Sequence, residues 1–379
     1  MAIFSPLKTT LRSIEHPGWV ESHLTLECPA GKSEFRDALE ELSGASVIGV
    51  DVFGTQEQTA DMKRLVRQAG IESPVTAVIS RAQSGGGLQV QAVSGKAPSP
   101  ILLDGKIAGY QVGSNGADFC FLGGLTPDNS GSSPEDQTGE VFSKIEKALS
   151  AAGMGFNHVI RTWFYNDEIL DWYTGFNRVR TGFFHRHAIQ RMPASTGIGA
   201  PNPAGTALVA KALAVRSDDC STAVREVRSP LQCDAFAYGS AFSRALEVAD
   251  ARSRTLYISG TASIEPGGKS VHKGDAAGQI RLTMEVVEAI LGEAGMDFGD
   301  TTRAVGYFRD PEHIAIWNDF SRGLPALPLL AVGCHVCRDD LLFEIELDAS
   351  SKMDSKGRRG QAYNLHAIQT EPGFSVPVY

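Results

Sequence analysis

Apolar and polar positions follow the same order twice along the chain. Each time, an apolar β-rich run that ends in glycines leads into a polar loop, an amphipathic helix, a strand, a second helix and a closing strand. In the later copy, Ile280, Met284, Val287 and Leu291 recur at helical spacing, and Gly295 is placed to end that helix. The pattern predicts a βαβαβ-like unit in each copy, with helices on one face of a mixed sheet, which is an α+β architecture.

The two copies also share residues at fixed distances along the chain. Residues 156–178 match residues 300–322 at an offset of 144, and residues 109–124 match residues 246–261 at an offset of 137. Self-similarity over so long a period indicates duplicated modules rather than a solenoid of short repeats. Divergence between the copies should then show which of them carries a site.

The duplication divides the chain into two domains and a tail. We predict an N-terminal domain, a C-terminal domain and a C-terminal tail, at residues 1–215, 216–349 and 350–379. The pattern of residues 1–108 is less legible, and we expect this segment to complete the sheet of the first duplicated module. The tail is polar and then extended, and we expect it to be disordered or to lie across the body as an arm.

Composition and charge narrow the class of protein. Hydrophobic residues make up 42% of the 379 and charged residues 21%, as in an ordinary globular chain. The net charge of −9 and the lack of a basic run argue against a nucleic-acid partner. No apolar stretch reaches the ~18 residues of a membrane-spanning helix, and the N-terminus lacks the apolar core of a signal peptide. We therefore expect a cytoplasmic protein with a small-molecule substrate and no membrane partner.

The six cysteines are too few and too scattered for a disulfide framework. The one suggestive group is CHVC at residues 334–337, which leaves a zinc or redox site open as an alternative. A zinc site needs about four ligands, and the sequence has no second CxxC or spaced His pair to complete one. We expect free thiols, no metal and no cofactor.

Two carboxylates distinguish the closing strand of the later copy. Glu344 and Glu346 share one face of the strand at 340–349, whereas the residues aligned with them in the earlier copy are Ala210 and Ala212. Two alternatives stay open: an outward polar face of an antiparallel sheet, or acids directed into a pocket. In a pocket, burial and a like-charged neighbour would raise the pKa of Glu344 and suit it to donate a proton.

Several runs resemble a known family. TLYISGTASI at 255–264, the long run VVEAILGEAGMDFGDTTRAVGYFRDPEHIAIWNDF at 286–320 and LLFEIELDA at 341–349 resemble a Rid (YjgF-type) module. With YNDEILDWYTGFNRVRTGFF at 165–184 and ASTGIGAP at 194–201, the duplicated arrangement is similar to the chorismatases of that superfamily. The resemblance covers about residues 109–349. It implies two duplicated Rid-like (chorismate-mutase-like) modules, mixed sheets with helices packed on one face, and an active site between the modules near the C-terminal strand.

The resemblance also implies roles for single residues. Glu344 falls on the catalytic acid of the family, and Cys337 on a cysteine carried by the members that form hydroxybenzoate. We therefore expect both residues in the catalytic site, with Cys337 lining the pocket. Leu329 stands where the simple Rid deaminases carry an Arg, which argues against deamination.

Chorismate, the substrate implied by the resemblance, is a dicarboxylate with an enol-ether side chain. We expect Arg161 and Arg244 to hold its carboxylates as bidentate partners, with a surface or interdomain ion pair as the alternative for each. Further substrate-binding residues are expected around the ASTGIGAP loop and where Rid modules line their cleft: Tyr165, Tyr173, Thr196, Gly197, Gly260 and Thr261.

The sequence therefore predicts a chorismatase that releases pyruvate and a hydroxybenzoate, with 3-hydroxybenzoate as the main product and 4-hydroxybenzoate as an additional one. The alternatives are a chorismate hydrolase that forms a dihydroxycyclohexadiene carboxylate, a non-catalytic Rid-type metabolite-binding protein, and a Rid-type deaminase with a relocated Arg. Since Rid modules trimerise but a fused pair could satisfy its own interfaces, we expect a monomer or a homotrimer.

Overall fold

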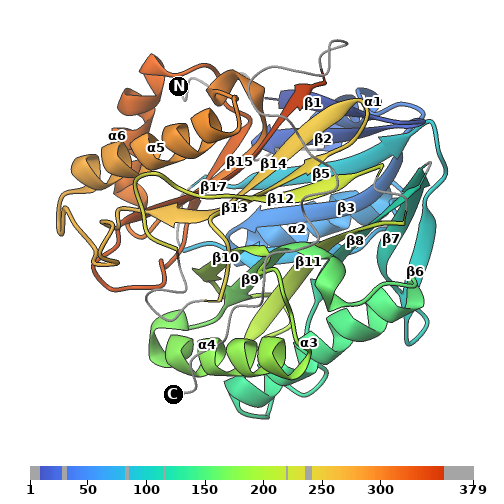
Figure 1. Cartoon of the computed structure of the whole chain (residues 1–379), viewed down its shortest axis with the longest axis horizontal. Helices are drawn as coiled ribbons and strands as arrows, with labels where there is room; N and C mark the ends of the chain where they lie inside the picture. Colours follow the sequence, from blue (N-terminus) through green and yellow to red (C-terminus); the bar gives the residue numbers. More distant parts are fainter. Residues whose placement is uncertain are drawn as a thin grey trace.

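The computed structural model describes residues 9–27, 32–81, 85–114, 116–218, 221–234 and 241–353. Its strands form three mixed sheets whose helices lie on the outside of the molecule (Figure 1). We call the segments that carry the three sheets the first, second and third modules: residues 9–94, 99–217 and 223–352. The last strand runs on to Lys352, and the rest of the expected tail, from residue 354, lies outside the described residues.

The first module is a five-stranded sheet in the order β1-β2-β5-β3-β4. Its strands are β1 (Thr9–His16), β2 (Trp19–Glu27), β3 (Ser46–Gly54), β4 (Val75–Ile79) and β5 (Gly87–Ser94), and its helices are α1 (Lys32–Glu40) and α2 (Gln56–Gln68). The expectation that residues 1–108 complete the sheet of the next module is confirmed for residues 99–108, which add strands to that sheet, and is wrong for residues 9–94. The closing strand β5 of the first module pairs with β2 and β3 of the same segment, so its sheet is complete by itself.

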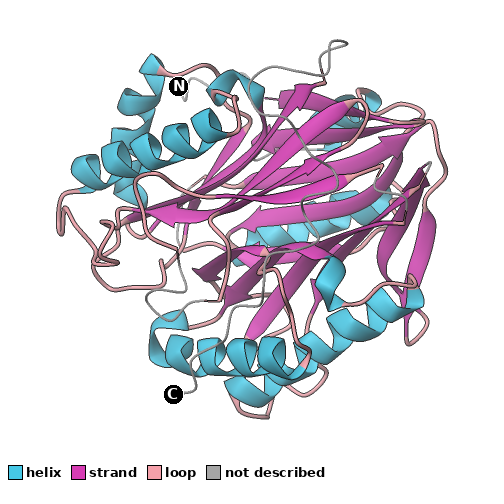
Figure 2. Ribbon diagram, viewed as in Figure 1, coloured by secondary structure: helices cyan, strands magenta, loops and turns pink. Residues whose placement is uncertain are grey.

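The second and third modules are the two predicted copies, and the predicted α+β architecture is confirmed (Figure 2). The second has the strand order β10-β9-β11-β8-β7-β6 and the third β12-β13-β14-β17-β15-β16. The strands of the second are β6 (Ser99–Leu103), β7 (Lys106–Ser114), β8 (Ala117–Leu125), β9 (Val159–Asn166), β10 (Ala194–Gly199) and β11 (Leu208–Ser217), with helices α3 (Pro134–Ala151) and α4 (Ile169–Arg186). Those of the third are β12 (Ala223–Val227), β13 (Ala245–Ala249), β14 (Ser253–Ala262), β15 (Thr301–Phe308), β16 (Leu329–Gly333) and β17 (Phe343–Lys352), with helices α5 (Ala276–Glu293) and α6 (Ile314–Phe320).

Each module contains an edge strand that the sequence pattern does not predict. The ASTGIGAP run, for which a turn was the alternative, forms strand β10, which pairs in parallel with β9. Strands β16 and β4 take the same place beside β15 and β3. A strand, a helix and a second parallel strand form the usual crossover unit, and these edge strands are too short to show a periodicity of their own.

The main helices begin where the sequence offers caps. The side chain of Ser133 accepts a hydrogen bond from the backbone N–H of Asp136 at the start of α3, and Pro134 occupies its first turn. Asp275 caps α5 in the same way, through the N–H of Gly278. Each helix buries its apolar face against the outer side of its own sheet, which gives each module a separate outer core.

The three modules pack head to tail around a common centre. The edge strand β4 lies beside β8 of the second module, β10 lies beside β14 of the third, and β16 lies beside β2 of the first. The inward faces of all three sheets share one apolar core, to which Phe53, Tyr165 and Tyr307 belong. The Tyr165 and Tyr307 hydroxyls lie 3.3 Å apart, and the rings of Phe53 and Tyr165 are 5.8 Å apart between centroids. One chain thus builds an approximately threefold arrangement from three related modules.

The register of the closing strands differs from the sequence alignment by one residue. Val209 pairs with Tyr165 in the second module as Glu344 pairs with Tyr307 in the third. Val209 also faces the common centre, whereas Ala210 belongs to the outer core beneath the helices. A slip of one residue moves a side chain to the opposite face of a strand. The structural counterpart of Glu344 is therefore Val209 rather than Ala210.

No helix within the described ranges is long and apolar enough to span a membrane.

Candidate functional site

A cleft lies between the second and third modules, where β10 approaches β14 and β17. The backbone N–H of Ser195 donates to Ser259 Oγ at 2.8 Å, and the N–H of Gly260 donates to Thr196 Oγ1 at 3.2 Å, so the two modules are joined along one wall. Helix α4 and the loop before β17 complete the lining, to which the following residues contribute: Tyr173, Arg180, Gly197, Phe242, Arg244, Gly260, Cys337, Arg338 and Glu344.

Glu344 is the acid of this cleft, and it is buried, with 5% of its surface exposed. Burial and the neighbouring carboxylate of Glu346 raise the pKa of Glu344 to about 8, although Arg161, Arg244 and Arg338 act against the rise. The carboxyl group is thus protonated at neutral pH. Of the two alternatives for this strand, the structure shows acids buried inside the protein, with Glu344 in a pocket, and it excludes an outward polar face.

The chain makes room for this carboxyl group at Gly260. A Cβ added to Gly260 would overlap the side chain of Glu344, so no larger residue fits there without displacing the acid. Thr196 accepts from Gly260 and also from Nη2 of Arg161, at 2.8 Å, which fixes β10 against β14 next to the acid. Of these sequence-predicted residues, Gly260 lines the cleft, as does Gly197, while Thr196 holds its wall.

Three guanidinium groups converge on the cleft. Nε and Nη2 of Arg244 donate to the carbonyl of Cys233 at 3.0 and 2.9 Å, and Nη2 of Arg180 donates to Oδ1 of Asn177 at 2.6 Å. Arg338 is anchored by a hydrogen bond of 2.8 Å from its Nη1 to the carbonyl of Gly268. Cations fixed around a buried pocket favour an anionic ligand, above all one with two carboxylates.

Of the three arginines, only Arg244 was predicted to bind substrate. Arg180 stands seven residues after Tyr173 on α4, so both fall on one face of that helix, and Arg338 directly follows Cys337. Helical spacing could therefore have placed Arg180 beside the predicted Tyr173. The position of Arg338 depends on how the loop before β17 folds back, for which the sequence gives no signal.

Arg161 lies elsewhere than expected. Its guanidinium is fully buried and pairs with Glu346, with Nη2 at 3.0 Å from Oε2, and it stacks over the ring of Trp163. It is not among the residues that line the cleft. The interdomain ion pair, the alternative for this residue, is therefore what the structure shows.

Cys337 and Tyr173 both line the cleft. Burial and the nearby Glu344 raise the pKa of the Cys337 thiol to about 12, so it is a neutral thiol rather than a thiolate. Burial, together with Cys337 and Glu344, also raises the pKa of Tyr173. The other cysteine of the CHVC group, Cys334, is buried in the common core. In the described ranges, no group of His, Cys, Asp and Glu side chains could hold a metal ion.

Two predicted site residues lie away from the cleft. Tyr165 is buried in the common core against Tyr307 and Phe53. The hydroxyl of Thr261 donates to the carbonyl of Ser259 at 2.8 Å, at an irregular step in the pairing of β14 with β17. Both residues shape the sheets behind the cleft, because tertiary packing turns their side chains away from it.

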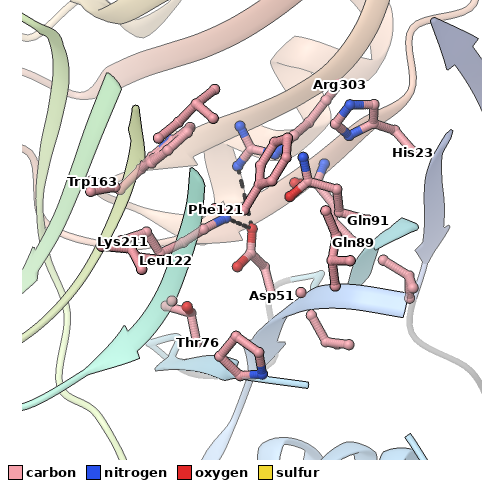
Figure 3. A pocket seen from close by; sticks show the side chains of 18 of the residues that line it. His23, Asp51, Thr76, Gln89, Gln91, Phe121, Leu122, Trp163, Lys211 and Arg303 are labelled. Carbon is pink, nitrogen blue, oxygen red and sulfur yellow. Dashed lines mark hydrogen bonds and ion pairs between the residues drawn. The ribbon is translucent and has the colours of Figure 1, made fainter. Parts of the chain in front are cut away.

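A second cavity lies at the centre of the molecule, where residues of all three modules line it (Figure 3). It is lined by charged side chains that neutralise one another, among them Asp51, Lys211 and Arg303. Its volume is about 40 Å³, as is that of the cleft beside Glu344, so volume does not distinguish the two. A carboxyl group with a raised pKa beside three arginines is the stronger indication of a reactive site, and it lies in the other cleft.

Comparisons with known proteins agree with this geometry. The endoribonuclease L-PSP family matches residues 107–210 and 234–351, which is more than half of the chain. The 3-hydroxybenzoate synthase of Streptomyces hygroscopicus is 28% identical over 223 residues, which span 51% of this chain and 63% of that enzyme, less than two thirds of its length. A crystal structure of a chorismatase superposes with a TM-score of 0.62 at 22% identity, over 82% of this chain and 95% of that one. The chain therefore belongs to the endoribonuclease L-PSP family.

Proposed function

We propose that this protein is a chorismatase that cleaves chorismate into pyruvate and a hydroxybenzoate, mainly 3-hydroxybenzoate. The observation that carries the proposal is a carboxyl group, protonated at neutral pH, in a cleft with three arginines. Chorismate needs an acid for its enol ether and cations for its two carboxylates. The names of the similar synthase and of the similar crystal structure support the same substrate.

Glu344 is the proton donor in this proposal. Its proton forms a C–H bond at the methylene carbon of the enolpyruvyl group, and the positive charge comes to rest on the ether carbon and oxygen. The ring hydroxyl next to the ether then displaces that oxygen, the ring C–O bond breaks, and the oxygen leaves as the keto oxygen of pyruvate. The proton of that ring hydroxyl passes to the Glu344 carboxylate, which restores the acid. One C–O bond of the resulting epoxide then breaks, and the C–H proton on the carbon that keeps the oxygen moves to this oxygen, which leaves hydroxybenzoate. No water is consumed.

Hydrolysis shares the first step. Water that reaches the charged ether carbon would add there, and the adduct would collapse to pyruvate and a dihydroxycyclohexadiene carboxylate. The Cys337 side chain borders the cleft as a neutral thiol, and a weakly polar group is a poor partner for such a water. This favours hydroxybenzoate over the diene diol.

Arg180, Arg244 and Arg338 hold the substrate carboxylates in this proposal. A cleft that only bound a dianion would gain nothing from a buried acid, which argues against a non-catalytic metabolite-binding protein. Deamination is disfavoured because Leu329, at the position of the deaminase Arg, is packed in the outer core of the third module.

The test is incubation of the purified protein with chorismate, followed by chromatography of the products and an assay of pyruvate. We expect pyruvate and 3-hydroxybenzoate in equal amounts. A diene diol in place of hydroxybenzoate would make the protein a hydrolase. Binding of chorismate without release of pyruvate would overturn the proposal in favour of a binding protein.

A further inference from the structure

Strand β17 carries two buried acids in different states. Glu344 and Glu346 lie two residues apart on the same face of the strand, which places their Cα atoms about 6.6 Å from each other. Glu344 opens into the cleft, while Glu346 points to the common centre, where none of its surface is exposed. The mechanism proposed above uses only the first of them.

Glu346 is held as a carboxylate by two arginines from different modules. Its Oε1 lies 2.6 Å from Nη2 of Arg303, and its Oε2 lies 3.0 Å from Nη2 of Arg161. Burial alone would raise the pKa of Glu346, but these two ion pairs hold it below its ordinary value. The carboxylate is therefore negatively charged throughout the neutral range.

The ion pairs continue into the first module. Arg303 also lies 3.8 Å from Asp51 of β3 and 3.4 Å from Asp348 of β17. Asp51 in turn is bound by Lys211 of β11, so one buried network joins all three modules (Figure 3). A charge that is fixed from several sides cannot turn away or take up a proton easily, and its field on a neighbouring group is constant.

The arginines of the cleft lower the pKa of Glu344, and the negative charge of Glu346 offsets this effect. A cation near Glu344 favours its ionised form, which cannot donate a proton, yet the substrate carboxylates need cations. The groups that face Glu344 from its own strand, from β9, from α4 and from the flanking loops are mixed in sign: Glu346, Arg161, Arg180, Arg244, Arg338, Cys337 and Tyr173. Glu346 is the anion among them.

We propose that Glu346 is a positioning residue for Glu344: the ion network of Arg161, Arg303, Asp51 and Lys211 fixes its negative charge, and that charge keeps Glu344 protonated among the cations of the cleft. The proposal rests on the proposed function only in taking Glu344 as the proton donor. It also gives the first module, which lies apart from the cleft, a role in the reaction through Asp51.

Two variants that should shift the pKa of Glu344 in opposite directions test this role. Glu346→Gln removes the negative charge and should move the pKa of Glu344 down by about one unit or more, whereas Arg161→Met removes a cation and should move it up, because Arg303 still holds Glu346. Glu344 must be protonated to act, so activity is lost as the pH rises through its pKa of about 8. The alkaline limb of the kcat/KM profile, which reports pKa values of the free enzyme, should therefore shift to lower pH in Glu346→Gln and to higher pH in Arg161→Met.

The matched control is Glu247→Gln. Glu247 is also a fully buried acid of the third module held by two arginines, with Oε1 at 2.9 Å from Nε of Arg225 and Oε2 at 3.6 Å from Nη1 of Arg254. It lies on β13 and does not line the cleft. Loss of this ion pair should lower stability without moving the alkaline limb. A purely structural Glu346 would behave in the same way, and that result would overturn the proposal.

A second readout does not depend on turnover. With glutamate labelled by ¹³C at its side-chain carboxyl carbon, the NMR signal absent from Glu344→Gln identifies Glu344, and its titration gives the pKa directly. Shifts in opposite directions in the two variants support the proposal even if chorismate is not a substrate, in which case only the proposed function fails. An unmoved titration in folded Glu346→Gln overturns the inference, and if that variant does not fold, the absence of an upward shift in Arg161→Met does so.

Discussion

The second module meets the first and the third through interfaces with the same backbone arrangement but different side-chain chemistry. Where β4 meets β8, the N–H of Gly124 donates to Thr76 Oγ1 at 2.9 Å, just as Gly260 donates to Thr196 where β10 meets β14. Beside the first of these interfaces, the closing strand carries Val209 in the place of Glu344, and Val209 lies in the common apolar core. The same joint between modules is thus built twice, and one of the two holds an acid.

The difference continues along the closing strands. Lys211 pairs with Trp163 as Glu346 pairs with Val305, so a cation of the second module stands where the third has an anion. In the first module, the corresponding position on β5 is the uncharged Gln89. The fold supplies three related surfaces, and the charge placed on each closing strand decides what that surface can do.

The largest effect on activity is expected from substitution of Glu344, whose counterpart at the other interface is Val209. Glu344→Gln keeps the shape and hydrogen-bonding capacity of the side chain but has no transferable proton, so pyruvate release should fall by roughly 10² or more. Release of pyruvate from chorismate is the measurement. The exposed acid Glu312 supplies the control variant Glu312→Gln, and turnover near the wild-type level in Glu344→Gln would remove this residue from the mechanism.

The second-largest effect is expected on the affinity for chorismate, from substitution of an arginine in the cleft of Glu344. Arg244→Ala removes a buried cation from the proposed substrate site and should weaken chorismate binding by about 2–5 kcal/mol. Calorimetric titration of the inactive Glu344→Gln background with chorismate gives the affinity directly. Arg216→Ala is the control, since that guanidinium pairs with Asp118 within the second module. Unchanged affinity together with lower stability would make Arg244 structural.

An acid introduced at Val209 tests whether the interface between the first and second modules can accommodate a carboxyl group as the cleft at Glu344 does. Val209→Glu buries a carboxyl group in an apolar core, whereas Val209→Gln has the same size without the charge. At pH 8 the Glu variant should be less stable by about 2–4 kcal/mol in urea denaturation. Burial raises the folded pKa of such a group, so the gap should open as the pH rises above about 4.3. Equal stability at pH 8 would show that a carboxylate at position 209 reaches water.

The smallest effect concerns the product rather than the rate. Cys337→Ala leaves space in the cleft, beside the proposed position of the reacting carbons, where a water molecule with polar partners can be held. We expect a shift from hydroxybenzoate toward the diene diol, with total pyruvate release less affected than in Glu344→Gln. Chromatography of the products measures the ratio. If the ratio does not change, Cys337 only fills space, and Cys334→Ala in the common core is the variant to compare with it.

The sequence by itself determined the local features of this protein. Its apolar periodicity and helix caps, as at Ser133 and Asp275, predict the helices and most of the strands, because these signals act within a few residues of chain. The repeat predicts two related modules. The pattern around Glu344, together with the family resemblance, directs attention to the acid that the structure places in the cleft.

Only the tertiary structure decided which side chains meet. The first module diverges too far for its repeat to be visible in the sequence, and a shift of one residue in β11 exchanges Val209 for Ala210 on the inner face. Arg180 and Arg338 reach the cleft from separate elements, while Arg161, on a strand with a strong pattern, turns to Glu346. Strand register and the partner of a long charged side chain depend on contacts between residues far apart in the chain. The free energy of those contacts is fixed only when the three modules have packed together.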